Sequence, residues 1–321
     1  MEREGQNMKR WIAILLTLAL AMSLAACGGA SSKPEDKKPS QSADAGTQTG
    51  PTKPAEPAKP DEPDEPSGGV YVLKDCTLVD NDQITVTVTG VEEKSGQIKF
   101  ELYLENKTEL SLMYSLDRVL VNGYLNDPYW AKVVAAGKKA NDAFSFDKNT
   151  LNGVGLLPID ELRFTLRVYD SEDWAADNLL DEEFTVYPTG KTAETVTHPD
   201  RVKTDGEQVV VDNDKGTFVI LSHDPYGFWG YTVRVFVENK TDSFAMFSWD
   251  DVSVNGLMVD PYWAVGIPAH SAAYTDISFS TADFEDNDID KVEEIEFNLR
   301  MYDDEDWSAD DYANETFTYK P

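Results

Sequence analysis

The sequence predicts an all-β protein in which two tandem immunoglobulin-like antiparallel β-sandwich domains follow a lipoprotein signal peptide and a disordered, proline-rich tether. Three observations lead to this prediction: a long internal repeat, apolar residues at every second position, and Asn-Gly pairs at strand ends. In chain order we expect a signal peptide over 1–26, a tether over 27–69, a first repeat over 70–188, a linker over 189–206 and a second repeat over 207–321.

The N-terminus has the pattern of a bacterial export signal. Residues 11–26 are almost wholly apolar and follow Lys9 and Arg10, which is the basic-then-apolar order of a secretory leader. This run of 16 residues is shorter than the roughly 20 that span a membrane. It ends in LAAC at 24–27, which resembles the lipobox of bacterial lipoproteins. The resemblance implies that Cys27 carries a diacylglycerol and becomes the first residue of the mature chain. Translation from Met1 or from Met8 is compatible with this pattern.

The next segment is rich in proline. From Pro51 to Pro66 a proline recurs at every third residue, which is the period of the polyproline II helix. At about 3.1 Å per residue, these 16 residues extend over roughly 50 Å. We expect a stiff spacer outside the membrane. The alternative is a ligand for proline-binding domains.

The internal repeat divides the remainder of the chain. Residues 105–188 align with 238–321 without a gap, at a constant offset of 133, and 35 of these 84 positions are identical. Self-similarity over this length predicts two copies of one structural unit.

Each copy has the pattern of short antiparallel strands. Apolar residues alternate with polar ones in both copies, as in Ile98, Phe100, Leu102 and Leu104 and again in Leu162, Phe164, Leu166 and Val168. The alternation changes parity after Asp117, which predicts a β-bulge or a break in the strand. Asn122-Gly123 and Asn255-Gly256 predict tight turns. We expect about seven strands per copy, which suits a β-sandwich.

An acidic segment follows one of the strands in each copy, over 171–177 and 304–310. An N-terminal Ser or Asp and further acidic residues predict one helical turn with an inward-pointing tryptophan. The same carboxylates are candidate calcium ligands, although the EF-hand spacing is absent; they are Asp170, Asp173, Asp177, Asp303, Asp306 and Asp310. Arg167 and Arg300 lie nearby, where they either pair with these acids or bind a ligand carboxylate.

Aromatic residues supply the other candidate site. The sequence Asp-Pro-Tyr-Trp recurs after each Asn-Gly turn, and its aromatic pairs are Tyr129, Trp130, Tyr262 and Trp263. They either stack on sugars or peptides or close the end of a sandwich core. The second copy has extra aromatic residues, which make it the better candidate for a binding surface; they are Tyr226, Phe228, Trp229, Phe244 and Trp249.

Composition excludes several classes of function. The chain has 321 residues and a net charge of -31, which opposes binding to nucleic acid. Two cysteines exclude a disulfide scaffold, and Cys76 is expected to be a small buried hydrophobe. The 3 histidines form no recognisable catalytic motif. We therefore expect no enzymatic activity and no cofactor.

The pattern V-x-V-N-G-x-x-x-D-P-Y-W followed by L-R-V-Y-D-x-E-D-W resembles uncharacterised surface lipoproteins of Gram-positive gut bacteria. The resemblance implies lipid-anchored immunoglobulin-like domains on the extracellular face of the cell membrane, and it supplies no site residues. The expected function is binding or adhesion, or an envelope structural role, toward an unidentified cell-surface or extracellular polymer or protein. The alternatives are a calcium-responsive module and an envelope hydrolase with paired carboxylates.

Overall fold

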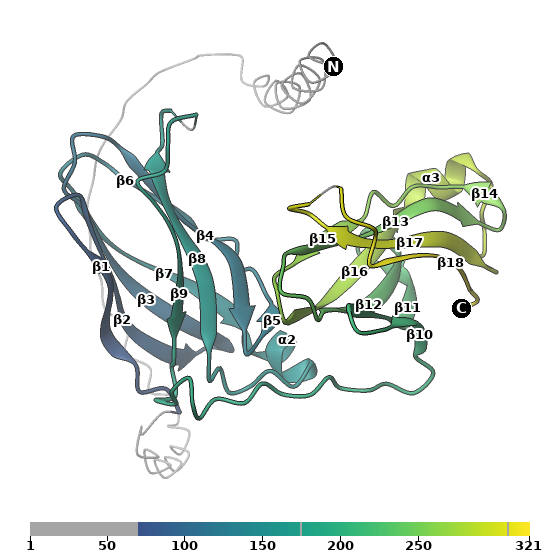
Figure 1. Cartoon of the computed structure of the whole chain (residues 1–321), viewed down its shortest axis with the longest axis horizontal. Coiled ribbons are helices and arrows are strands. Elements are labelled where there is room, and N and C mark those ends of the chain that lie inside the picture. The colour runs from purple at the N-terminus through teal and green to yellow at the C-terminus, as the bar shows by residue number, and fades with distance from the viewer. Residues whose placement is uncertain (1–69, 174, 307) are drawn as a thin grey trace, which may run out of the picture. The chain divides into compact units, whose positions relative to one another are not determined.

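The computed structural model describes residues 70–173, 175–306 and 308–321, which fall within one unit of the chain, Asp64–Pro321 (Figure 1). The predicted signal peptide, Cys27, the tether, Trp174 and Trp307 lie outside the described residues. Among the described residues, no helix is both long and apolar enough to cross a membrane.

The first repeat consists of two antiparallel sheets. One sheet has the order β1-β2-β3-β7, with β1 Lys74–Asp80, β2 Ile84–Lys94, β3 Gln97–Asn106 and β7 Lys139–Asp147. In the other, β4 pairs with β8, which pairs with β9, while two short strands flank β4. The bounds are β4 Leu112–Val121, β5 Tyr124–Leu125, β6 Ala131–Val134, β8 Leu162–Asp170 and β9 Leu180–Val186.

The second repeat has the same plan. Its first strands have the order β10-β11-β12-β16, with β10 Gln208–Asp212, β11 Gly216–Gly227, β12 Gly230–Asn239 and β16 Ser271–Ser280. Through the pairing of β16 with β5, they form one continuous sheet with β4, β8 and β9 of the first repeat. Its second sheet has the order β14-β13-β17-β18, and β15 also pairs with β13. The bounds are β13 Ala245–Val254, β14 Leu257–Met258, β15 Ala264–Ile267, β17 Ile295–Asp303 and β18 Ala313–Tyr319.

The all-β prediction with tandem sandwiches is confirmed. Each repeat has seven longer strands and two short ones that the alternation did not reveal, because two to four residues are too few to show a period. The bulge expected after Asp117 is present, since the β4–β8 register shifts between Asp117 and Leu120. Asn122 and Gly123 have φ values of 50° and 83°, as a type I′ turn requires.

The sandwich cores follow the predicted rows. Leu162, Phe164, Leu166 and Val168 of β8 are at most 1% exposed, and all four inward residues of β17 are fully buried: Ile295, Phe297, Leu299 and Met301. Burying each such side chain stabilises the fold by about 1.5–3 kcal/mol. Cys76, the cysteine that the structure describes, is a free thiol, so side-chain packing and strand pairing hold each repeat.

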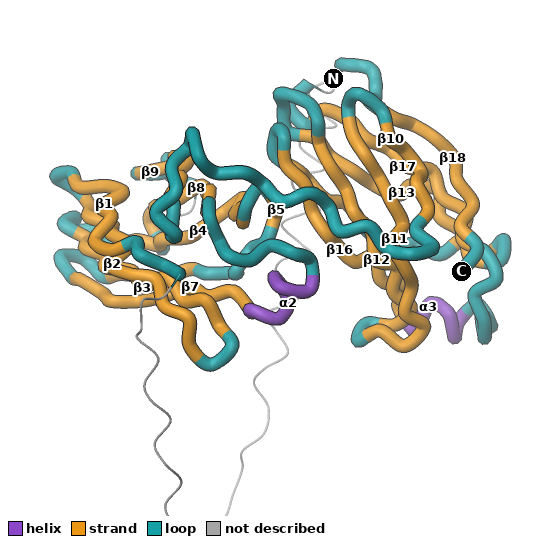
Figure 2. Tube along the Cα trace, turned by 90° about the horizontal axis from the view of Figure 1, so that it is seen from below, coloured by secondary structure: helices purple, strands orange, loops and turns teal. Residues whose placement is uncertain are grey.

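The predicted helical turns at 171–177 and 304–310 are wrong. The described residues there form bends and a turn closed by the Ala176 N–H, which donates to the Asp173 carbonyl at 3.1 Å. The Asp173 carboxylate accepts from the Ala175 N–H, and this local bond competes with helix formation. The short helices lie elsewhere, at α2 Lys148–Gly153 and α3 Thr281–Asp286, capped by Asp147 and Ser280 (Figure 2).

The two repeats also contact each other within this unit. The Ala272 N–H of β16 donates to the Gly123 carbonyl at 3.1 Å, and β16 pairs with β5 in parallel at this point. The Tyr124 and Tyr274 rings stack with centroids 5.7 Å apart. The segment predicted as a linker contributes Pro199, whose carbonyl accepts from the Tyr124 hydroxyl.

Candidate binding site

The most distinctive exposed feature of the second repeat is the tip of the β11–β12 hairpin. Tyr226, Phe228 and Trp229 are 93%, 90% and 75% exposed. The Phe228 and Trp229 rings meet edge to face, with centroids 4.8 Å apart. Three large aromatic side chains in one exposed loop are unusual in a folded protein. Exposed apolar patches of this kind mark interaction surfaces.

Local backbone geometry fixes this tip. The β11–β12 register shifts between Asp224 and Gly227, so that Pro225 and Tyr226 form a bulge. The Asp224 carboxylate accepts from the Tyr226 N–H at 3.0 Å. At Gly230, which has a φ of 118°, a Cβ atom would lie 2.2 Å from the Phe279 carbonyl oxygen. Only glycine fits there, and the aromatic tip is therefore held close to β16.

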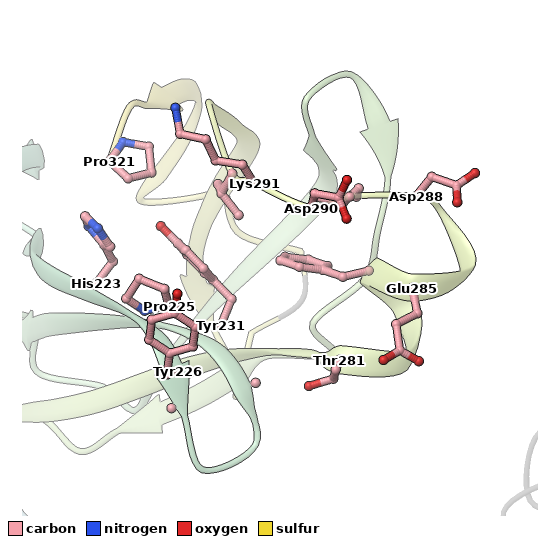
Figure 3. A pocket seen from close by; sticks show the side chains of 15 residues that line it. His223, Pro225, Tyr226, Tyr231, Thr281, Glu285, Asp288, Asp290, Lys291 and Pro321 are labelled. Carbon is pink, nitrogen blue, oxygen red and sulfur yellow. The ribbon is translucent and has the colours of Figure 1, made fainter.

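A cavity of about 950 Å³ lies beside the hairpin (Figure 3). Its walls come from the end of β11, the start of β12, helix α3 with the loop that follows it, and Pro321. Tyr231 and the half-buried Phe284 supply aromatic surface inside it, with ring centroids 6.0 Å apart. A mixed apolar and polar cavity of this size is large enough for a small ligand or a peptide side chain with its flanking backbone.

Two side chains on one wall have an unusual arrangement. The His223 ring stacks on Tyr231 with centroids 5.7 Å apart, and its Nδ1 atom lies 2.9 Å from the Tyr319 hydroxyl. Tyr231 is only 7% exposed, and in the described part of the chain its hydroxyl has no hydrogen-bond partner. Burial raises the pKa of Tyr231 well above its usual range, so the hydroxyl is a neutral donor. A buried, unpaired hydroxyl costs free energy unless a ligand satisfies it.

The rim of the cavity is acidic. Glu285, Asp288 and Asp290 are exposed around it, with Lys291 beside them. Asn255 holds this part of the rim, because its Nδ2 donates to the Lys291 carbonyl at 2.7 Å and its Oδ1 accepts from the Glu293 N–H at 2.8 Å. The site therefore combines apolar walls with a negative rim, and it favours a ligand that is apolar and partly cationic.

The structure separates the two aromatic residues of each Asp-Pro-Tyr-Trp motif. Tyr129 and Tyr262 are 93% and 88% exposed, with φ values of 51° and 49°. The tryptophans pack inward: Trp130 is 9% exposed, and the Trp263 ring lies edge to face with Phe218 at 5.9 Å. The tryptophans thus pack against the cores, and the tyrosines are the more exposed of the four. A binding role for these four residues stays a prediction.

The two candidate arginines pair with acids, Asp117 on the neighbouring strand β4 and Asp311 in the loop before β18. Arg167 donates through Nη1 to Asp117 at 3.1 Å, and Arg300 donates through Nε and Nη2 to both carboxylate oxygens of Asp311. Each guanidinium also lies over the ring of a tyrosine two residues further along the strand, Tyr169 or Tyr302. The geometry is that of ion pairs, and a role in ligand recognition stays a prediction.

The six candidate calcium ligands lie in the turns, where several of them bind backbone amides. The Asp170 carboxylate accepts from the Glu172 N–H, and the Asp306 carboxylate from Ser308. Asp303 accepts from the Glu305 N–H and from the Ser243 and Tyr312 hydroxyls, which lowers its pKa to about 2. In residues 70–321, apart from 174 and 307, no three His, Cys, Asp or Glu residues are grouped as a metal site would require. Asp173, Asp177 and Asp310 join no such group, and calcium binding stays untested.

Sequence reasoning found the hairpin aromatics but missed the cavity beside them. Of the five extra aromatic residues in the second copy, Tyr226, Phe228 and Trp229 are exposed, whereas Trp249 is only 4% exposed. His223, Tyr231 and Phe284 were missed, because residues far apart in sequence meet only when β11, β12 and α3 are assembled. The one available signal was the difference between the repeats: the rings of His223 and Tyr231 stack on each other, and the first copy has Val91 and Ile98 at these positions.

Comparison with known proteins adds little. No protein-family model and no curated protein matches the chain. Among solved structures it is similar to the Salmonella enterica SafA pilin in complex with the SafB chaperone, with 12% identity over 76% of this chain and 98% of that chain and a TM-score of 0.23. Similarity at this level assigns no function and no site residue.

Proposed function

We propose that this protein is a non-catalytic binding protein of the cell surface, which recognises a partner through the cavity and hairpin tip of its second repeat. The observation that carries the proposal is the set of three exposed aromatic side chains beside a cavity of about 950 Å³. The partner belongs to the polymers or proteins found outside the cell.

The proposed location depends on the N-terminal sequence. A lipobox-like LAAC at 24–27 supports lipidation of Cys27, and several acyl chains together anchor a protein stably to a membrane. The proline-rich segment then separates the repeats from the lipid. Replacement of Cys27 by Ser tests this: we expect the chain to leave the membrane fraction and lose incorporation of labelled fatty acid, and unchanged membrane attachment would contradict it.

The binding surface is tested by exchanging the hairpin turns. The double variant Phe228→Ser/Trp229→Gly gives the second repeat the turn residues of the first, Ser95 and Gly96. We expect the full chain to bind at least one material in a panel of glycans, cell-wall polymers and extracellular proteins, and the variant to lose that binding by at least tenfold. Each fully buried aromatic contact contributes about 1.5–3 kcal/mol, and tenfold is about 1.4 kcal/mol.

The matched control is Met258→Ser, which removes another exposed hydrophobe of the second repeat, 67% exposed on β14. It is expected to bind as the wild type does. Binding that is insensitive to the hairpin exchange, or equally weakened by Met258→Ser, would place the site elsewhere.

A further inference from the structure

The cavity of the second repeat has a covered counterpart in the first. At the repeat offset of 133, Phe284, Ile289 and Val292 correspond to Leu151, Leu156 and Ile159. The three residues of the first repeat are 1%, 2% and 0% exposed. In the second repeat Ile289 is 9% exposed, and Phe284 and Val292 are only half-buried. Some part of the chain therefore covers this place in the first repeat only.

The cover is the extended segment that precedes β1. The Tyr71 hydroxyl accepts from the Ile159 N–H at 3.3 Å, and Tyr71 and Leu73 pack against the core. The N–H groups of Val72 and Leu73 donate to the Pro188 carbonyl at 2.8 and 3.2 Å. An aromatic side chain, an aliphatic side chain and backbone hydrogen bonds thus fill the first repeat's own site.

The second repeat lacks an equivalent cover. Strand pairing matches Cys76 with Gln208, so Lys203, Thr204 and Asp205 stand where Tyr71, Val72 and Leu73 stand in the first repeat. These residues are polar, and the Thr204 N–H donates to Glu207 at 3.0 Å within a turn. Meanwhile Pro321, the counterpart of Pro188, lines the open cavity.

We propose that the open cavity of the second repeat binds a short extended peptide with an aromatic side chain, supplied by a partner protein, in the manner in which Tyr71 and Leu73 fill the first repeat. The inference rests on the proposed binding function and names its ligand class. The ligand's aromatic ring lies against Phe284 and Tyr231, and backbone pairing near the end of β18 fixes its direction.

Two polar groups in the cavity fit such a ligand. The Val292 N–H, counterpart of the donor that meets Tyr71, has no hydrogen-bond partner in the described part of the chain. It can donate to a tyrosine hydroxyl. The buried Tyr231 hydroxyl also has no partner there, and it can donate to a backbone carbonyl of the peptide. An extended peptide offers both acceptors.

The negative charge of the cavity rim further restricts which peptides fit. The rim carries Glu285, Asp288 and Asp290 against Lys291, and the whole chain has a net charge of -31. A basic residue near the aromatic one is therefore favoured, and in the first repeat Lys74 follows Tyr71 by three residues. The exposed ring of Trp229 is available to contact such a cation.

The direct test uses the covering segment itself as the probe. A fluorescently labelled peptide with the sequence Val-Tyr-Val-Leu-Lys of residues 70–74, with both ends blocked, is titrated into the full chain and its anisotropy is measured. We expect saturable binding, and at least tenfold weaker binding when alanine replaces the peptide's tyrosine. The peptide variant leaves the protein unchanged, so loss of folding cannot explain the result.

A variant of the protein locates the site. Phe284→Asp places a charge in the cavity and is expected to weaken binding of the peptide at least tenfold, while Met258→Ala is expected to leave it unchanged. A circular dichroism melt of each variant establishes that it is folded. Absence of saturable binding, equal binding of the alanine peptide, or binding unaffected by Phe284→Asp in a folded protein would each overturn the proposal.

The result is separable from that of the hairpin exchange. If the exchange abolishes binding to an extracellular material while the peptide shows no saturable binding, the proposed function stands and the peptide inference is wrong. If the peptide binds as expected but the exchange affects no extracellular material, the cavity is a peptide site and the hairpin is not the recognition surface.

Discussion

The two repeats have a hairpin at the same place, β2–β3 in the first and β11–β12 in the second, and they differ in the side chains at its turn. In the first, Ser95 and Gly96 make a polar turn with φ values of 53° and 78°. In the second, Phe228 and Trp229 occupy the turn and are 90% and 75% exposed. Each hairpin has two residues between its last paired positions, so the turns have the same length. The difference teaches that duplication kept the scaffold and changed one end of one copy.

The cores of the two repeats also differ in a way that is measurable. Phe297 stacks on Trp249 with centroids 3.8 Å apart, whereas its counterpart Phe164 has a tilted contact with Phe184 at 6.3 Å. We expect Phe297→Ala to lower the free energy of unfolding by about 4–5 kcal/mol and Phe164→Ala by about 3–4 kcal/mol. Urea denaturation of the full chain measures both. Equal losses would show that the stacked pair contributes no more than its buried area.

The second comparison concerns the two Asn-Gly turns. Asn122 is 3% exposed, and its side chain bonds the carbonyls of Leu156 and Pro158 and the N–H groups of Asp160 and Glu161. Asn255 is exposed, and its side chain bonds only one carbonyl, that of Lys291, together with the two corresponding N–H groups on the cavity rim. We expect Asn122→Ala to lower the free energy of unfolding by about 2–3 kcal/mol and Asn255→Ala by about 1 kcal/mol. Only Asn122→Ala leaves buried carbonyl and N–H groups without a hydrogen-bond partner. Chemical denaturation checks the order, and a reversed order would contradict this reasoning.

The smallest expected effect depends on pH. Hydrogen bonds from Arg201 lower the pKa of Glu207 to about 2, and the first repeat has the exposed Asp75 at this place. Because the folded pKa lies below the unfolded value, the stabilisation is complete above about pH 4.5 and is lost as the pH falls toward 2. Glu207→Gln is expected to cost about 1 kcal/mol at pH 7, after allowance for solvent screening, and almost nothing at pH 2. A cost that is independent of pH would show that the ion pair is not its source.

Much of the scaffold could be predicted from residue patterns, because strand alternation and Asn-Gly turns are local. The rows in β8 and β17 and the bulge after Asp117 were found in this way. The helical turns at 171–177 and 304–310 were wrongly predicted, since carboxylates that bind nearby amides favour a turn as much as a helix.

The candidate site was predicted only in part. Tyr226, Phe228 and Trp229 stood out because the first copy has no aromatic residues there. The cavity could not be predicted, since its volume depends on how α3 packs against β11 and β12 and on the absence of a cover. Tyr71 gave no sequence signal of its role either, because its partner Ile159 is 88 residues away.

The clasp formed by Val72 and Leu73 on the Pro188 carbonyl also has a mechanical consequence. These residues precede β1 in the chain, so tension from the N-terminal side loads this clasp before it loads β1. The contacts that would break are the two backbone hydrogen bonds to the Pro188 carbonyl and the contacts of the Tyr71 side chain. A force that breaks these contacts would remove Tyr71 from the first repeat before any strand of the sandwich separates. The first repeat would then have an open cavity of the same kind as the second.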